Sequence, residues 1–183
     1  ATGCSAGVLA ALIEKSVFEV HEKIVSRFNG EDVVITPDFS FNAQQQQAFD
    51  SIQEQFQSKE VVLLHGVTAS GKTQLYIRLI EAQLAQGKNV LYLLPEIALT
   101  AQITDRLKMH FGDKLGVYHS KFNDNERAEV WHKVMKNEFQ VIIGARSSIF
   151  LPFQHLGLVV VDEEHESSYK QYDPAPRYQS RDT

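Results

Sequence analysis

From about Phe41 onward, short continuous apolar runs alternate with longer stretches in which apolar residues recur at helical spacing. Continuous runs are typical of strands buried on both faces, because a strand with one wet face alternates apolar and polar residues. Strands that alternate with helices predict right-handed crossovers and a mostly parallel α/β sheet with helices on both faces. The predicted strands are 61–64, 90–94, 115–118, 141–143 and 158–161, and the predicted helices are 73–86, 98–111 and 125–136.

The first part of the chain has a different rhythm. The pattern predicts a helix over 5–15 and a strand-like stretch over 17–25, followed by a turn at Asn29 and Gly30. A helix plus a hairpin of this length is too small to enclose a core. We therefore expect two units: residues 1–37, as the end of another small domain or an arm, and residues 38–183, as the main domain.

The composition excludes several classes of protein. The sequence has 183 residues with a single Cys, Cys4, which excludes a disulfide framework and a four-Cys zinc site. With 18 basic and 23 acidic residues the net charge is −5, so a nucleic acid would have to bind a local patch. No apolar run approaches the roughly 20 residues of a membrane helix, and nothing after Ala1 predicts a signal peptide. We expect no membrane partner and regard the chain as part of a longer protein.

The first predicted strand leads into a phosphate-binding motif: Gly, four residues, then Gly-Lys-Thr, directly before a predicted helix. Glycines let successive N–H groups point at phosphate oxygens, and the positive end of the helix adds to that field. Lys72 is expected to reach the β- and γ-phosphates of ATP, and the Thr73 hydroxyl to bind Mg²⁺. The alternative is an ordinary glycine turn. The residues expected to bind the nucleotide here are Gly66, Thr68, Ala69, Ser70, Gly71, Lys72 and Thr73.

The last predicted strand ends in a cluster of ionisable residues, Asp162-Glu163-Glu164-His165, which we call the acidic box. Carboxylates at this point must be solvated, paired or metal-bound. With the phosphate loop upstream, Asp162 is predicted to hold Mg²⁺ directly or through water. Glu163 is then expected to orient and deprotonate the attacking water, and His165 to sense the γ-phosphate. The alternative is a solvated acidic loop.

Polar side chains that suit nucleic acid occur in two places. Aromatic and cationic residues interleave near the C-terminus, where rings can stack on bases and cations can follow phosphates. Hydroxyls and one Arg follow other strand ends, and therefore open on the same edge of the sheet. A solvated tail and ordinary helix capping are the respective alternatives. The candidate residues are Tyr169, Lys170, Arg177 and Tyr178 in the first place, and Thr100, His119, Arg146 and Ser147 in the second.

Four further motifs make a specific resemblance: LPEIALT at 94–100, GARSSIF at 144–150, DEEHESSYKQ at 162–171 and PRYQSRD at 176–182. Together with the phosphate loop they resemble the PriA family (primosomal protein N′) of superfamily 2 DNA helicases from bacteria, over residues 41–183. The resemblance implies a RecA-like ATP-binding domain and an ATP-driven 3′→5′ DNA helicase that acts in replication restart. It also implies single-stranded and forked DNA, replication-restart proteins and the replicative helicase as partners, in the bacterial cytoplasm.

The resemblance extends to individual residues. Gln45 would read adenine, residues 1–37 would end a winged-helix domain, and the segment after the acidic box would be the loop that couples DNA binding to hydrolysis. Ala69 stands where the family usually has Gly, a departure between the two fixed glycines that we expect to be tolerated. The family's zinc-binding cysteines and second core domain are not in this sequence. We therefore expect this chain alone to bind Mg-nucleotide weakly and to hydrolyse it negligibly.

Two other functions remain open from the residues alone. A P-loop phosphoryl transferase would need a basic lid and an acceptor pocket, and no Arg-rich lid is evident. A non-catalytic, nucleotide-regulated binding module would have no need of Glu163. Phosphate transfer to acceptors other than water would identify the transferase, and equal partner affinity with and without nucleotide would separate the module from a motor.

Overall fold

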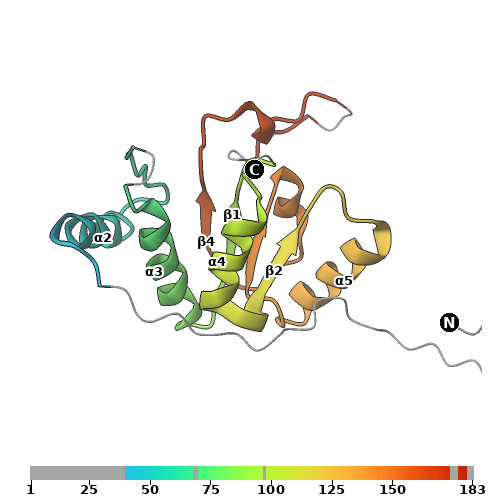
Figure 1. Ribbon diagram of the computed structural model, residues 1–183, viewed down its shortest axis with the longest axis horizontal. Helices are drawn as coiled ribbons and strands as arrows, with labels where there is room; N and C mark the ends of the chain where they lie inside the picture. Colours follow the sequence, from blue (N-terminus) through green and yellow to red (C-terminus); the bar gives the residue numbers. More distant parts are fainter. Residues whose placement is uncertain (1–39, 68–69, 97, 174–176, 181–183) are drawn as a thin grey trace, which may run out of the picture.

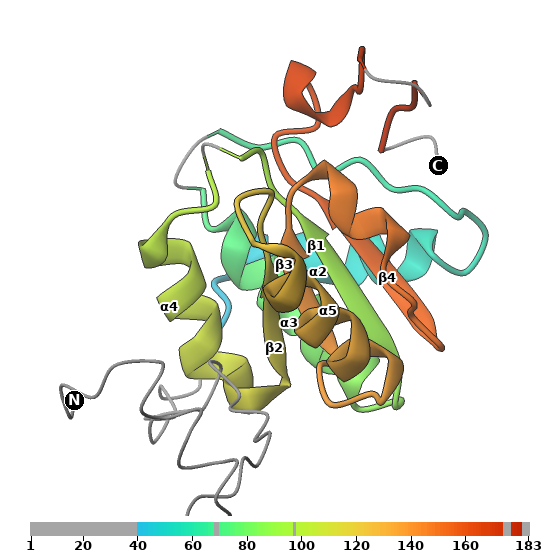
Figure 2. The same ribbon diagram turned by 90° about the vertical axis from the view of Figure 1, so that its right-hand side faces the viewer.

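The computed structural model describes residues 40–67, 70–96, 98–173 and 177–180. Its sheet has the strand order β2-β3-β1-β4, and every neighbouring pair is parallel. The strands β1 (Asn89–Leu93), β2 (Leu115–Tyr118), β3 (Val141–Gly144) and β4 (Leu156–Val161) coincide closely with four of the five predicted runs. They form one twisted sheet (Figures 1 and 2). The parallel α/β architecture is confirmed.

The described residues form four α-helices: α2 (Ala43–Gln55), α3 (Lys72–Leu84), α4 (Ala101–Phe111) and α5 (Asp124–Met135). The helices α3, α4 and α5 pack on the sheet, and α2 lies beyond α3 (Figure 1). Short 3₁₀ turns lie at Gly112–Lys114, Arg146–Phe150 and Ser167–Tyr169. Capping boxes begin α2 at Asn42 and α5 at Asn123, where side chain and backbone satisfy each other's hydrogen bonds. The sequence predicts an adenine-reading residue at Gln45 but no helix there, whereas α2 contains Gln45 and continues to Gln55. None of the described helices is both long and apolar enough to cross a membrane.

Two apolar clusters cover the two faces of the sheet. One joins side chains of α3 and α4 to alternate positions of the central strands, including Val90, Tyr92 and Ile143. The other packs α5 and the 3₁₀ turns against the intervening positions, including Leu91, Leu93 and Ile142. The strand β1 is buried along its whole length, because β3 and β4 flank it and one apolar cluster packs on each of its faces. The prediction of a sheet covered on both faces is confirmed.

The predicted strand at 61–64 is wrong for the described sheet. This segment is not a strand, and Val61 and Leu63 are 83% and 76% exposed. An apolar run has the composition of a strand, but a strand also needs a partner for its backbone hydrogen bonds. In the part of the chain that is described, β4 is an edge strand, and its Leu156 and Val159 are also exposed.

The topology brings the predicted chemistry to one edge. In Figure 1 the loop before α3, the end of β4 and the segment 162–173 all lie toward the upper side, where the strands end. Residues 1–37, with the predicted winged-helix segment, lie outside the described residues, as do Thr68 and Ala69 of the phosphate loop.

Candidate functional site

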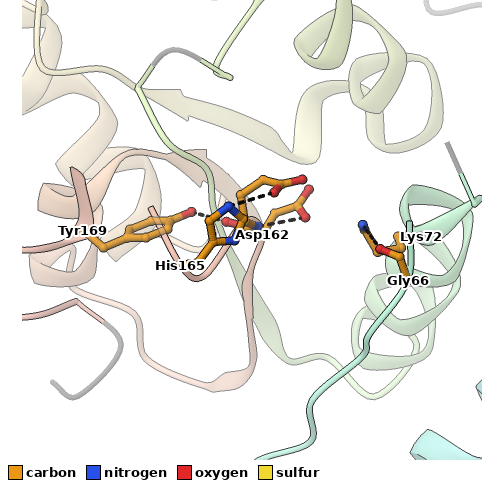
Figure 3. A network of polar contacts seen from close by, with 6 residues as sticks. Gly66, Lys72, Asp162, His165 and Tyr169 are labelled. Carbon is orange, nitrogen blue, oxygen red and sulfur yellow. Dashed lines mark hydrogen bonds and ion pairs between the residues drawn. The ribbon is translucent and has the colours of Figure 1, made fainter. Parts of the chain in front are cut away.

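The phosphate loop turns directly into α3. Lys72 is the first residue of that helix, and its Nζ donates a hydrogen bond to the carbonyl oxygen of Gly66 at 2.7 Å (Figure 3). This bond holds the ammonium against the residue that opens the motif, at the N-terminus of α3. Thr73 is half-buried on the same turn, and Ser70 is exposed. This arrangement suits an anion.

Gly71 at the N-cap of α3 has φ +87°, a conformation that favours glycine. A Cβ at this position would collide with the side-chain amide nitrogen of Gln45. That nitrogen donates to Oε1 of Gln74 at 2.6 Å, while Oε1 of Gln45 accepts the N–H of Asn42 at 3.1 Å. The residue that the sequence proposed for adenine thus lies against the phosphate loop.

Asp162 follows β4 directly, and each of its polar groups is engaged. Its N–H donates to the Leu93 carbonyl at 3.0 Å. Its Oδ1 accepts the N–H of Glu163 at 3.1 Å, and its Oδ2 accepts the Tyr92 hydroxyl at 2.9 Å. Its own carbonyl accepts the Tyr169 hydroxyl at 2.6 Å. Two hydrogen bonds hold the carboxylate and two hold the main chain of Asp162, at the end of β4.

Glu163 has φ +49°, which is uncommon for a residue with a side chain. Its carbonyl accepts the N–H of Glu166 at 2.9 Å, so the chain turns sharply after β4. Its Oε2 lies 3.7 Å from Nε2 of His165, and both side chains are exposed. Left-handed backbone at a non-glycine residue is a conformation that recurs at functional sites.

The two halves of the candidate site, the phosphate loop and the acidic box, face each other. Figure 3 shows the Lys72 ammonium and the Asp162 carboxylate directed toward one another, from the loop before α3 and from the end of β4. Among the described residues, no group of three or more His, Cys, Asp or Glu could hold a metal ion. A divalent ion here would have one carboxylate and the Thr73 hydroxyl, with the rest of its shell from phosphate and water. That donor set is the one Mg²⁺ commonly uses beside nucleotides.

Three buried tyrosines surround the acidic box. Burial first, and then the charge of Asp162, raises the pKa values of Tyr76, Tyr92 and Tyr169 well above the ordinary value of 10.0. The rings of Tyr76 and Tyr92 meet edge to face with centroids 5.5 Å apart. All three side chains therefore remain neutral at physiological pH. A neutral tyrosine hydroxyl can donate a hydrogen bond to a carboxylate or a carbonyl.

A second cluster lies beside the acidic box, where Arg146 contacts the C-terminal segment. Its Nη1 donates to the Lys170 carbonyl at 2.7 Å, and its guanidinium lies 5.7 Å from the centre of the Tyr178 ring. Tyr178 also packs edge to face on Phe150, at 5.0 Å between centroids. Lys170 lies over the ring of Tyr172, with its ammonium 4.8 Å from the centroid. These contacts link cations to two exposed rings and the half-buried ring of Tyr178. We call this group the aromatic cluster: Arg146, Phe150, Lys170, Tyr172 and Tyr178.

The remaining residues proposed for nucleic acid have simpler surroundings. Thr100 and Arg177 are exposed, and Thr100 is the N-cap of α4 without a hydrogen bond from its side chain to the helix. Ser147 is half-buried in the turn after β3. The Nδ1 atom of His119 accepts the N–H of Lys121 at 3.0 Å, which closes a local turn.

The expectation that Tyr169 stacks on a base is at odds with the structure. Its side chain is 1% exposed, and its hydroxyl donates to the carbonyls of Leu93 and Asp162. The ring belongs to the apolar cluster on the α5 face, so none of it is available to a base. Few aliphatic residues surround Tyr169 in the sequence, but aliphatic residues of β1 and α5 reach it in space.

Sequence reasoning missed Tyr92, Gln74 and Phe150. Tyr92 lies in an otherwise aliphatic run after Asn89, and a hydroxyl in such a run signals a buried polar partner. Gln74 lies beside the Gly-Lys-Thr motif, and Phe150 ends the motif at 144–150, but nothing in the linear pattern assigns either residue a contact.

A parallel sheet with a phosphate-loop sequence before a helix and a carboxylate at a strand end is typical of P-loop nucleotide-binding domains. The chain belongs to the DEAD/DEAH box helicase family, whose model matches residues 42–181. It is similar to replication restart protein PriA of Bacillus subtilis, 40% identical over 99% of this chain and 23% of that protein. PriA of Chlamydia trachomatis is 43% identical over 99% of this chain and 25% of its own length. These relatives confirm the resemblance that the motifs predicted.

The fold also matches a solved structure of RecG bound to a three-way DNA junction. The TM-score is 0.57 at 20% sequence identity, over 87% of this chain and 20% of that one. At this identity the likeness concerns the fold alone, and it agrees with a RecA-like domain. The chain spans about a quarter of the length of the curated PriA relatives that it matches.

Proposed function

We propose that this chain is the ATP-binding domain of a DNA helicase that acts in replication restart. The observation that carries the proposal is the placement of Lys72 and Asp162, which face each other at the carboxyl edge of the sheet (Figure 3). A cation in a phosphate loop opposite a fixed carboxylate is the arrangement by which a motor domain holds a Mg-nucleotide. Similarity to PriA of several bacteria supports the role in restart and a place of action at bacterial DNA.

In this proposal the residues divide the work. Gly66, Ser70, Gly71 and Lys72, with Thr68 and Ala69 between them, cradle the phosphates, and Gln45 contacts adenine. Thr73 and Asp162 hold Mg²⁺, which when bound neutralises charge that develops on the phosphates. Glu163 orients the attacking water and accepts its proton. His165, beside Glu163, responds to the γ-phosphate.

The aromatic cluster is proposed as part of the single-strand DNA path. Exposed rings and cations suit sequence-neutral binding, because bases stack and phosphates pair with positive charge. Arg177, Thr100, Ser147 and His119 are proposed to extend this path along the same edge of the sheet. Forked DNA, other restart proteins and the replicative helicase are proposed partners of the intact protein, meaning this domain with the chain that naturally accompanies it.

The test separates binding from chemistry in the intact protein. Lys72→Ala is expected to weaken ATP binding at least about 10-fold, because it removes a charge contact to the phosphates. Glu163→Gln is expected to keep ATP binding but to lose about 100-fold or more in turnover, because the general base is gone. Lys88→Ala and Glu138→Gln remove the same charges near the opposite ends of the strands and serve as controls. Full turnover in Glu163→Gln would remove that residue from the mechanism.

A phosphoryl transferase is disfavoured by the exposed, water-accessible position of Glu163. Transfer of the γ-phosphate to an acceptor other than water would nevertheless identify one. A non-catalytic module is disfavoured by the presence of Glu163 in the turn after β4, because a module without catalysis would have no need of that carboxylate. Equal DNA affinity with and without nucleotide would favour such a module.

A further inference from the structure

Tyr92 is the fourth of the five residues of β1, where it is fully buried and pairs in register with Val160 of β4. Its ring packs in the cluster between the sheet and the helices α3 and α4. From there its hydroxyl donates to Oδ2 of Asp162 at 2.9 Å, two residues beyond its register partner. The bond therefore joins the interior of the sheet to the carboxylate at its edge.

The rest of Asp162 is held independently of Tyr92. The Leu93 carbonyl and the Tyr169 hydroxyl fix its main chain, and the Glu163 N–H binds Oδ1. Among the described residues, the Tyr92 hydroxyl is the one hydrogen-bond partner of Oδ2. Without this bond the carboxylate would keep only the Glu163 N–H on Oδ1, and Oδ2 could turn about that contact while the strand end stays in place. Each carboxylate oxygen still has a lone pair free for a further ligand.

We propose that Tyr92 is a positioning residue, whose buried hydroxyl fixes the Asp162 carboxylate in the orientation that binds the metal of a Mg-nucleotide. The inference rests on the proposed function, because it assigns a supporting role to the carboxylate of that same site. It accounts for a tyrosine in a strand position where phenylalanine would fill almost the same volume. The neighbouring positions 90, 91, 93 and 94 are all aliphatic, so packing alone does not explain a hydroxyl at position 92.

The test uses Tyr92→Phe in the intact protein, with Tyr76→Phe as its matched control. Tyr76 is another buried tyrosine, in edge-to-face contact with Tyr92, but no hydrogen bond joins it to Asp162 in the described structure. The measured quantity is the affinity for a fluorescent ADP analogue in excess Mg²⁺, divided by the affinity in EDTA. Loss of a group that orients a metal ligand typically costs about 10- to 100-fold in metal affinity. We expect Tyr92→Phe to lower this ratio about 10-fold while the affinity in EDTA stays unchanged, and Tyr76→Phe to alter neither.

Asp162→Asn separates the two levels of the argument. If Asp162→Asn lowers the ratio but Tyr92→Phe does not, the positioning role is wrong and the proposed site survives. If Asp162→Asn leaves the ratio unchanged, the proposed function itself fails. In the Asp162→Asn background, Tyr92→Phe is expected to cause no further loss. A further loss there would show that Tyr92 acts on the fold rather than through the carboxylate, and would overturn the inference.

Discussion

The side-chain amide of Gln45 donates a hydrogen bond to Oε1 of Gln74 at 2.6 Å, and this bond joins α2 to the first turn of α3. The same amide nitrogen lies against Gly71, so α2 and the phosphate loop are in direct contact. A nucleotide whose phosphates bind the loop would place its base within the region that α2 borders. The proposed role of Gln45 as the residue that binds adenine can therefore be tested by mutation.

Gln45→Ala is predicted to weaken ATP binding about 10-fold while GTP binding changes little, because an amide pairs with the donor and acceptor edge of adenine. Binding of both nucleotides is measured on the intact protein. Gln46→Ala is the control, since Gln46 bonds to Asp50 within its own helix. Equal losses for ATP and GTP would show that Gln45 only braces the loop.

Gly71→Ala is predicted to lower the free energy of unfolding by at least about 1 kcal/mol, because the new Cβ meets both a positive φ and the Gln45 amide. Gly87→Ala is a matched control, with φ +71° but nothing within 4 Å of the added Cβ. Denaturant unfolding of both variants isolates the collision from the backbone strain. Equal losses in the two variants would mean that the Gln45 contact yields without cost.

Tyr169→Phe is predicted to cost about 1–3 kcal/mol of stability, because it removes a donor from two main-chain carbonyls at the ends of β1 and β4. Tyr172→Phe is the control, since that side chain is 61% exposed. Thermal unfolding measures both. If Tyr169→Phe instead keeps its stability and loses DNA affinity, the ring leaves its buried position to meet the nucleic acid.

Arg146→Ala is predicted to weaken single-strand DNA binding and to reduce the salt slope of log K by about 1, the effect of one lost phosphate contact. Arg106→Ala, on the exposed side of α4, is the control and is predicted to leave the slope unchanged. The structure allows a second outcome, because Arg146 also binds the Lys170 carbonyl. Weaker binding with an unchanged slope would mean that Arg146 orders the aromatic cluster and touches no phosphate.

Stability is predicted to fall at alkaline pH through the three buried tyrosines. Their folded-state pKa values lie above the unfolded value of 10.0, so the native state keeps protons that the unfolded state has released. Their stabilisation is complete below about pH 10 and is lost as the pH rises further, at up to about 1.4 kcal/mol per pH unit for each tyrosine. Denaturant unfolding between pH 8 and pH 11 measures the slope. Tyr76→Phe should make the slope shallower. An unchanged slope would mean that Tyr76 does not contribute to the loss of stability at alkaline pH.

Much of the architecture was predictable because it depends on local pattern. Four of the five apolar runs became strands, and the three predicted helices formed with shifts of a few residues at their ends. The helix α4 begins later than its apolar pattern, because Thr100 is extended and acts as the N-cap. The phosphate loop and the acidic box were recognisable for the same reason: their chemistry depends on spacing within a few residues, and the order of strands then brings both to one edge.

The sequence by itself determined the parallel sheet, the motifs and the family resemblance, since periodicity and short-range spacing are written along the chain. Only the tertiary structure decided that 61–64 has no strand partner in the described sheet, that Tyr169 is buried, and that Tyr92 and Gln74 contact the site. Each of these depends on which distant segments meet. Burial and hydrogen bonding are properties of pairs of segments, and a linear pattern specifies only one member of each pair.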